Sequence, residues 1–371
     1  MPAQEPPEQA GEDTPLIRDD VNPTMATPLP ARQLCGLMPL LIAESVMSTS
    51  IMPYINQLVS DLPVTGGDKI KVGYYAGFII SLYFFGEAFT VLQWNRLSDS
   101  IGRKPVLLSG TLGLMIATIL FGLSQTFWSL ALSRFLAGAL NGNIGVVKTM
   151  LGEMTDDTNI ARVFSLIPLT WATGIIIGSS AGGFLSRPHD RWPQLFSDPF
   201  WVQHPYFLPC AATSVYAMAS LVFASVFLKE VDTMTFDMSN LVTFADENGI
   251  PEQDQEGPPR PSWSSSLLTK PVVLIVSIYA AHAYLEISNT ALVAVVYTTP
   301  IRFGGLGLDP ARMGTCLAAF GIITGFLPFL VFDRIVRVLG RRRALLAFMS
   351  CLIPAFLLFP INGTRAQHVG V

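Results

Sequence analysis

Charged residues are scarce in this chain. Asp, Glu, Lys and Arg make up 13% of its 371 residues, whereas 50% are hydrophobic. A soluble domain carries about a quarter charged residues, so water is not the main solvent of this protein. The formal net charge of −4 also gives no sign of a nucleic-acid partner.

Other absences narrow the function. The sequence contains no Gly-x-x-x-x-Gly-Lys-Ser/Thr motif, so we do not expect ATP hydrolysis to drive it. It contains neither a His-Glu-x-x-His helix nor a paired-carboxylate protease motif, so we do not expect an enzyme. No cofactor is expected. The cysteines show no metal-ligand spacing or disulfide framework, which leaves them as packing residues: Cys35, Cys210, Cys316 and Cys351.

Long apolar runs fill most of the chain. A helix needs roughly 20 mainly apolar residues to cross a bilayer, and helices satisfy their own backbone groups in lipid. The sequence therefore predicts an all-α multi-pass membrane protein. The first 30 residues are polar and acidic, so no cleavable signal peptide is expected. Nine runs meet the length criterion: 34–56, 73–94, 105–124, 127–148, 163–185, 206–228, 271–296, 313–333 and 343–361.

One charged corner occurs twice. "NRLSDSIGRK" (95–104) aligns with "DRIVRVLGRR" (333–342), and Gly102 then falls on Gly340. Each corner follows the second span of its half, which predicts two homologous halves, as in many secondary transporters. The density of Lys and Arg places both corners and the N-terminus on the cytosolic side. The expected division is a disordered cytosolic tail, a six-helix bundle, a disordered cytosolic linker, an incomplete three-helix bundle and a polar tail: 1–32, 33–229, 230–268, 269–361 and 362–371.

The corner and two further motifs resemble the major facilitator superfamily. The family pattern Gly-x-x-x-Asp-x-x-Gly-Arg-Lys is met except at Asn95, which replaces the first Gly. "RFLAGALNGNIG" matches the family's Arg-containing fourth span through Arg134 and Gly138, and "GIIIGSSAGG" matches the Gly-rich fifth span of exchangers. Ser179 stands where exchangers have Pro, which weakens the inference of an antiporter. "PYIN", "GEMTDDTN" and "WATGIIIGSSAGGFLSRP" resemble the zinc-induced-facilitator-like branch and its fungal relatives.

The resemblance implies a fold of twelve helices in two bundles around a central cavity. Nine runs are present, so the sequence predicts a major-facilitator-type fold that is truncated at its C-terminal end. A gating role is implied for the first corner, where Asp99 and Arg103 would grip neighbouring helix ends beside Gly102 and Lys104. The alternative is that these charges only determine topology.

Three charges lie deep inside apolar runs. A charged residue at the centre of a membrane helix costs at least ~2.5 kcal/mol, so Arg134 predicts a functional site or a buried ion pair. Glu44 and Glu87 are its candidate partners. Protonation of either carboxylate would loosen its hold on Arg134, which makes the three residues candidates for proton coupling. A purely structural ion pair is the alternative.

The seventh run carries a polar stripe on one helical face. Tyr279, His282, Glu286 and Asn289 are predicted to line the cavity. A zinc site is not predicted, because one His and one Glu provide only half of a tetrahedral set. In the fifth run, small residues at every fourth position predict a helix-packing face: Gly174, Gly178 and Gly182.

Together these features predict a secondary active transporter. It would move a small solute across a lipid bilayer by alternating access, as a monomer and through proton-coupled efflux or antiport. The alternative is a truncated, non-transporting membrane protein with a regulatory role or none. "EDTPLI" fits an acidic dileucine signal through Glu12, Leu16 and Ile17, which favours the vacuolar membrane; the plasma membrane is the other candidate.

Overall fold

The computed structural model describes residues 28–156, 159–230, 270–301 and 305–340, together with residues 343, 347, 350 and 354. All regular elements in this part of the chain are helical. The predicted linker and both predicted tails fall almost wholly outside the described residues, as do Arg341, Arg342 and most of the ninth run.

The predicted runs form the long helices. These are α1 (Ala31–Thr49), α3 (Lys69–Ile101), α4 (Arg103–Leu123), α5 (Phe127–Ala139), α6 (Asn143–Glu153), α8 (Leu166–Leu185), α11 (Phe207–Phe227), α14 (Lys270–Thr298) and α15 (Pro310–Leu339). Short helices connect them: α2 (Ile55–Ser60), η1 (Pro63–Thr65), α7 (Ile160–Phe164), α9 (Pro188–Arg191) and α10 (Pro199–Gln203).

Within the described part of the chain, seven helical segments are long and apolar enough to cross a membrane. They begin at Lys71, Arg103, Phe127, Arg162, Phe207, Val272 and Pro310. The first predicted run also forms a helix, α1, but α1 is not among the seven. Its polar start and the internal Glu44 reduce its apolar character. The number nine is therefore not confirmed, whereas the all-helical multi-pass architecture is.

The fourth predicted run is interrupted. Instead of one helix over 127–148, α5 ends at Ala139 and α6 begins at Asn143. At the break, a Cβ added to Gly142 would lie 2.0 Å from the Trp94 ring, so only glycine lets α3 approach this closely. The break matters for the site because it releases Asn141 toward the interior, where it is fully buried.

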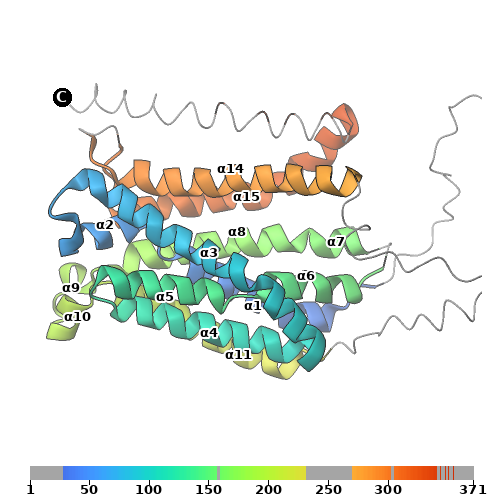
Figure 1. Cartoon of the computed structure of the whole chain (residues 1–371), viewed down its shortest axis with the longest axis horizontal. Coiled ribbons are helices and arrows are strands. Elements are labelled where there is room, and N and C mark those ends of the chain that lie inside the picture. The colour runs from blue at the N-terminus through green and yellow to red at the C-terminus, as the bar shows by residue number, and fades with distance from the viewer. Residues whose placement is uncertain are drawn as a thin grey trace, which may run out of the picture.

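Helix α8 joins the two parts of the molecule. It packs against α1 on one side and α15 on the other, and Figure 1 shows α14 and α15 running along the same side of the first bundle. A Cβ added to Gly174 would lie 2.0 Å from the Ser45 side chain of α1. A Cβ added to Gly182 would lie 1.8 Å from the carbonyl of Ser50, in the turn after α1. Toward α15, a Cβ added to Gly183 would lie 3.1 Å from the Gly314 Cα. Small residues thus permit backbone contact on both faces.

The two corner glycines both have a positive φ angle. Gly102 follows the end of α3 with φ of 99°, and Gly340 follows the end of α15 with φ of 77°. Positive φ angles favour glycine because it lacks a Cβ. The local geometry therefore agrees with the sequence alignment of the two corners.

Candidate functional site

A cavity of about 560 Å³ lies where the first bundle meets α14 and α15. Its walls come from α1, α3, α5 and α8 on one side and from α14 and α15 on the other. The volume falls within the range of 300–1,000 Å³ that small-molecule sites occupy. Polar groups on the first-bundle wall include Ser48, Thr49, Tyr83, Arg134 and Ser179.

Arg134 is buried and reaches this cavity from α5. The residue is only 3% exposed. Its guanidinium carbon lies 4.8 Å from the centre of the Tyr83 ring and 5.9 Å from the centre of the Phe121 ring. The expected ion pair with Glu44 or Glu87 is absent among the described residues. Aromatic faces contact the cation instead, which is a favourable arrangement in a desolvated place.

Glu44 belongs to a buried hydrogen-bond network beside the cavity. The Asn141 amide donates to its Oε1 at 2.8 Å and to the Tyr83 hydroxyl at 2.7 Å, and the Ser48 hydroxyl donates to Tyr83 at 3.2 Å. Oε2 of Glu44 is buried without a hydrogen-bond partner among the described residues. The network therefore links the carboxyl to the ring that contacts Arg134. Asn141 and Tyr83 were missed, although an Asn inside an apolar run was a readable signal.

The remaining predicted residues divide between positions inside and outside the cavity wall. Glu286 and Asn289 line the cavity from α14, whereas Tyr279 and His282 are exposed and do not. They lie on the predicted face of the same helix, but α14 extends past the cavity, so only the half of the stripe nearer Thr298 reaches it. Glu87 is partly buried on α3 and does not line the cavity either.

The predicted corner is tied together by Arg103. Its guanidinium lies 2.6 Å from Asp99, donates to Ser98 at 2.6 Å and pairs with Glu153 of α6 at 2.7 Å. The backbone N–H of Arg103 donates to Glu230, which follows α11, at 2.6 Å. The predicted contact between Asp99 and Arg103 is thus present, and the corner connects α3, α4, α6 and the end of α11.

Two carboxylates of this corner were missed. Glu153 lies in "GEMTDDTN" after the fourth run, and Glu230 is the first acidic residue after the sixth run. Both follow spans that end on the side of the Arg103 corner, which was a signal. Glu230 also accepts from the Lys104 N–H at 3.2 Å, so it caps the first turn of α4 with a negative charge. A Cβ on Gly102 would lie 2.9 Å from this carboxylate.

A second ionic cluster closes the opposite end of the bundle, beside α9 and α10 (Figure 1). Arg187 donates to both carboxylate oxygens of Asp61, at 2.8 and 2.7 Å, and the Tyr206 hydroxyl donates to Asp61 at 2.7 Å. Burial, followed by the negative charge of Asp61, raises the pKa of the Tyr206 phenol. Burial alone would lower the pKa of Arg187, but its bonds to Asp61 and Tyr206 raise it overall. Nothing in the local sequence indicated this cluster.

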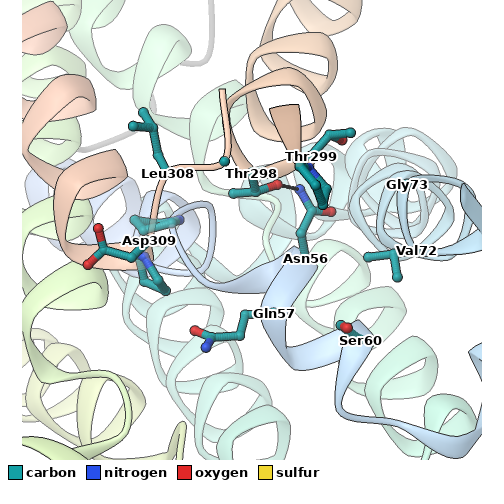
Figure 2. A pocket seen from close by; sticks show the side chains of 13 residues that line it. Asn56, Gln57, Ser60, Val72, Gly73, Thr298, Thr299, Leu308 and Asp309 are labelled. Carbon is teal, nitrogen blue, oxygen red and sulfur yellow. Dashed lines mark hydrogen bonds between the residues drawn. The ribbon is translucent and has the colours of Figure 1, made fainter. Parts of the chain in front are cut away.

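A smaller pocket of about 270 Å³ lies near this second cluster, where α2 and α3 meet the turn between α14 and α15. Figure 2 shows Asn56 and Thr298 joined by a hydrogen bond across it, with Gln57 and Ser60 on the α2 side. The first bundle and α14 are therefore bonded to each other at this end of the molecule.

Comparison with known proteins decides the family. The pattern of the Major Facilitator Superfamily matches residues 37–368. The chain belongs to the Major Facilitator Superfamily. It is therefore an integral multi-pass membrane protein and a membrane transporter of small molecules, not an enzyme.

Relatives in the superfamily confirm the predicted branch. ZINC INDUCED FACILITATOR-LIKE 1 of Arabidopsis thaliana is 31% identical over 78% of this chain and 59% of its own length. Major facilitator-type transporter psiT2 of Psilocybe cyanescens is 29% identical over 94% and 71%. Multidrug transporter mfsB of Aspergillus fumigatus is 28% identical over 89% and 66%. The chain thus spans about 59–71% of the length of these relatives.

Solved structures agree on the fold. A bacterial homologue of the human lysosomal transporter Spinster, in an inward-facing and unoccupied conformation, aligns with a TM-score of 0.55 at 15% identity, over 92% of this chain and 74% of its own. A D-xylose–proton symporter aligns with a TM-score of 0.52 at 13% identity, over 91% and 79%. These two confirm the superfamily fold and nothing finer.

Proposed function

We propose that this chain is a proton-coupled secondary transporter that exports or exchanges a small organic solute by alternating access. The observation that carries the proposal is the cavity between the first bundle and α14–α15, because its walls belong to two parts of the molecule. Relative movement of those parts would open it to either side.

The glycine contacts of α8 support such a movement. Gly174, Gly178 and Gly182 give α8 a flat face toward α1, and Gly183 meets Gly314 of α15. Flat contacts of this kind let helices shift without large side chains blocking one another. At the end of the molecule beside α2, the bond between Asn56 and Thr298 would have to break when the cavity opens there.

Glu44 is the proposed proton carrier. Its carboxyl is buried, one oxygen accepts from Asn141 and the other has no partner among the described residues, so a proton can be accommodated there. Protonation and release at Glu44 would alter the bonds of Asn141 and Tyr83, and Tyr83 contacts the cavity cation Arg134. Proton binding at Glu44 would thereby affect the cavity residue Arg134 through the side chains of Asn141 and Tyr83.

The relatives support export as the direction. The name of a further relative, efflux pump azaK of Aspergillus niger, describes outward movement by that protein. For location, the dileucine-type signal at Glu12, Leu16 and Ile17, which lies outside the described residues, favours the vacuolar membrane over the plasma membrane.

Flux in proteoliposomes tests the proposal. We expect an imposed pH gradient to drive uptake of a permanently charged aromatic probe, either naphthalene sulfonate or naphthyl trimethylammonium. Glu44→Gln should lose at least tenfold of the gradient-driven rate and keep gradient-independent exchange of the probe, because only the proton step is removed. The matched control is Glu87→Gln, which removes a partly buried carboxyl of α3 that lies outside the cavity wall. Absence of gradient-driven flux of both probes would contradict the proposal.

A further inference from the structure

Arg134 is a cavity cation with no counter-charge in the part of the chain that the structure describes. Among the described residues it forms no hydrogen bond and no ion pair, and its Nε is buried without a partner. The residue nevertheless lines the cavity, so the unbonded guanidinium is presented to whatever occupies that space. Removal of one partner from a buried ion pair is strongly unfavourable, so a cation left alone in this place indicates a partner that comes and goes.

The described protein groups that contact the Arg134 guanidinium are aromatic rings, not anions. The centres of the Tyr83 and Phe121 rings lie 4.8 and 5.9 Å from its guanidinium carbon. The nearest acid network, at Glu44, is already bonded to Asn141. A guanidinium is planar and donates in pairs to carboxylate, sulfonate or phosphate oxygens. The unused N–H donors of Arg134 therefore match an oxyanion carried by the solute.

The other lining residues of the cavity indicate what the uncharged part of that solute is like. Phe84 and Trp171 line the first-bundle side, and Tyr297 and Phe320 line the α14–α15 side. Aromatic walls of this kind contact flat apolar groups by stacking or edge-to-face packing. A volume of about 560 Å³ holds a molecule of one or two fused rings with substituents.

Glu286 places a negative charge on the wall opposite to that of Arg134. It lies on α14, lines the cavity and forms no ion pair with any described residue. One cation and one anion on different walls disfavour a solute that carries two negative groups, since the second group would approach Glu286. Repulsion of this kind provides specificity as effectively as attraction does.

From these observations, and resting on the proposed transport function, we infer that the cargo is a small aromatic monoanion or zwitterion. Arg134 binds its oxyanion, and Glu286 excludes dianions and accepts a cationic substituent.

Equilibrium binding to the full chain in nanodiscs tests the inference with probes of one shape. The probes are naphthalene sulfonate, naphthylmethanol and naphthalene disulfonate. Arg134→Gln should weaken sulfonate binding at least tenfold and leave naphthylmethanol binding within twofold, whereas Arg134→Lys should retain part of the sulfonate affinity. Arg162→Gln, which removes an exposed cation outside the cavity, should change neither. Equal loss of both probes in Arg134→Gln would overturn the inference, because it would show a structural role.

A second variant, Glu286→Gln, leaves Arg134 intact. Its result therefore does not depend on whether Arg134→Gln folds. It should raise the affinity for the disulfonate about tenfold and leave the monosulfonate nearly unchanged; unchanged disulfonate binding would overturn the role of Glu286. The two proposals are separated by flux. Charge-selective binding without flux supports the inference and rejects transport, and flux that ignores Arg134 supports transport and rejects the inference.

Discussion

Each end of the first bundle carries one arginine with ion-pair partners, but the two arginines lie in different surroundings. Arg103 is 5% exposed and bonds to groups from α3 and α6, with Glu230 on its backbone. Arg187 is 34% exposed and bonds mainly to Asp61 and Tyr206. Exposed ion pairs contribute about 0–1 kcal/mol, whereas a buried charge that loses its partners is costly. The comparison indicates that charge holds one end and backbone packing holds the other.

Arg103→Gln should destabilise the protein more than Arg187→Gln does, and an equal loss would contradict the comparison. The substitution leaves Glu153 without its cation and removes the only described ionic link between α4 and α6. We expect a loss of about 2 kcal/mol, below the 3–5 kcal/mol of a fully buried pair because Asp99 is 62% exposed. Thermal unfolding in detergent measures the loss, and flux should fall with it. Arg96→Gln, an exposed arginine of the same corner, should be neutral.

Gly182→Ala tests packing near the Arg187 end. A Cβ there would lie 1.8 Å from the Ser50 carbonyl, which is backbone and cannot rotate away. Overpacking of this kind costs about 1–3 kcal/mol. Gly77→Ala is the matched control, since a Cβ at Gly77 meets nothing within 4 Å, and alanine favours helix. Equal melting temperatures for the two variants would contradict the idea that backbone contact holds this end.

Arg187→Gln should give the smallest effect of the three. Both partners of its ion pair are partly exposed, so we expect a loss of no more than about 1 kcal/mol. The loss should shrink further in 1 M salt, which screens exposed charges within about 3 Å. Unfolding measured at low and high salt gives the test. A loss equal to that of Arg103→Gln, unchanged by salt, would show that the two ends are alike after all.

The difference between the two ends of the first bundle also explains why only the Arg103 corner could be predicted from the sequence. The Arg103 corner is local: Asp99, Gly102 and Arg103 follow one another on a single turn, so a motif captures them. The Arg187 cluster joins residues more than a hundred positions apart, at Asp61 and Arg187, and such contacts depend on how helices pack. The apolar runs likewise predicted the helices themselves, because length and hydropathy are local properties.

Packing also decided the candidate site. Arg134 and Glu44 were identified as buried charges, but the ion pair between them was an assumption about distance. The interruption of the helix near Asn141 places an amide beside Glu44. Packing of α3 against α5 places the Tyr83 ring beside Arg134. Tyr279 and His282 shared a helical face with Glu286, yet periodicity does not tell where along a helix a cavity ends.

The position of Glu230 determines which helices would bear a mechanical force applied to the segment that follows it. This residue is where the polypeptide leaves the first bundle, and its carboxylate grips the first turn of α4. A pull on the segment that follows is therefore shared between α4 and α11 instead of unwinding α11 alone. A fluorophore attached just beyond this point would report strain at the Arg103 corner directly, without any label inside the membrane.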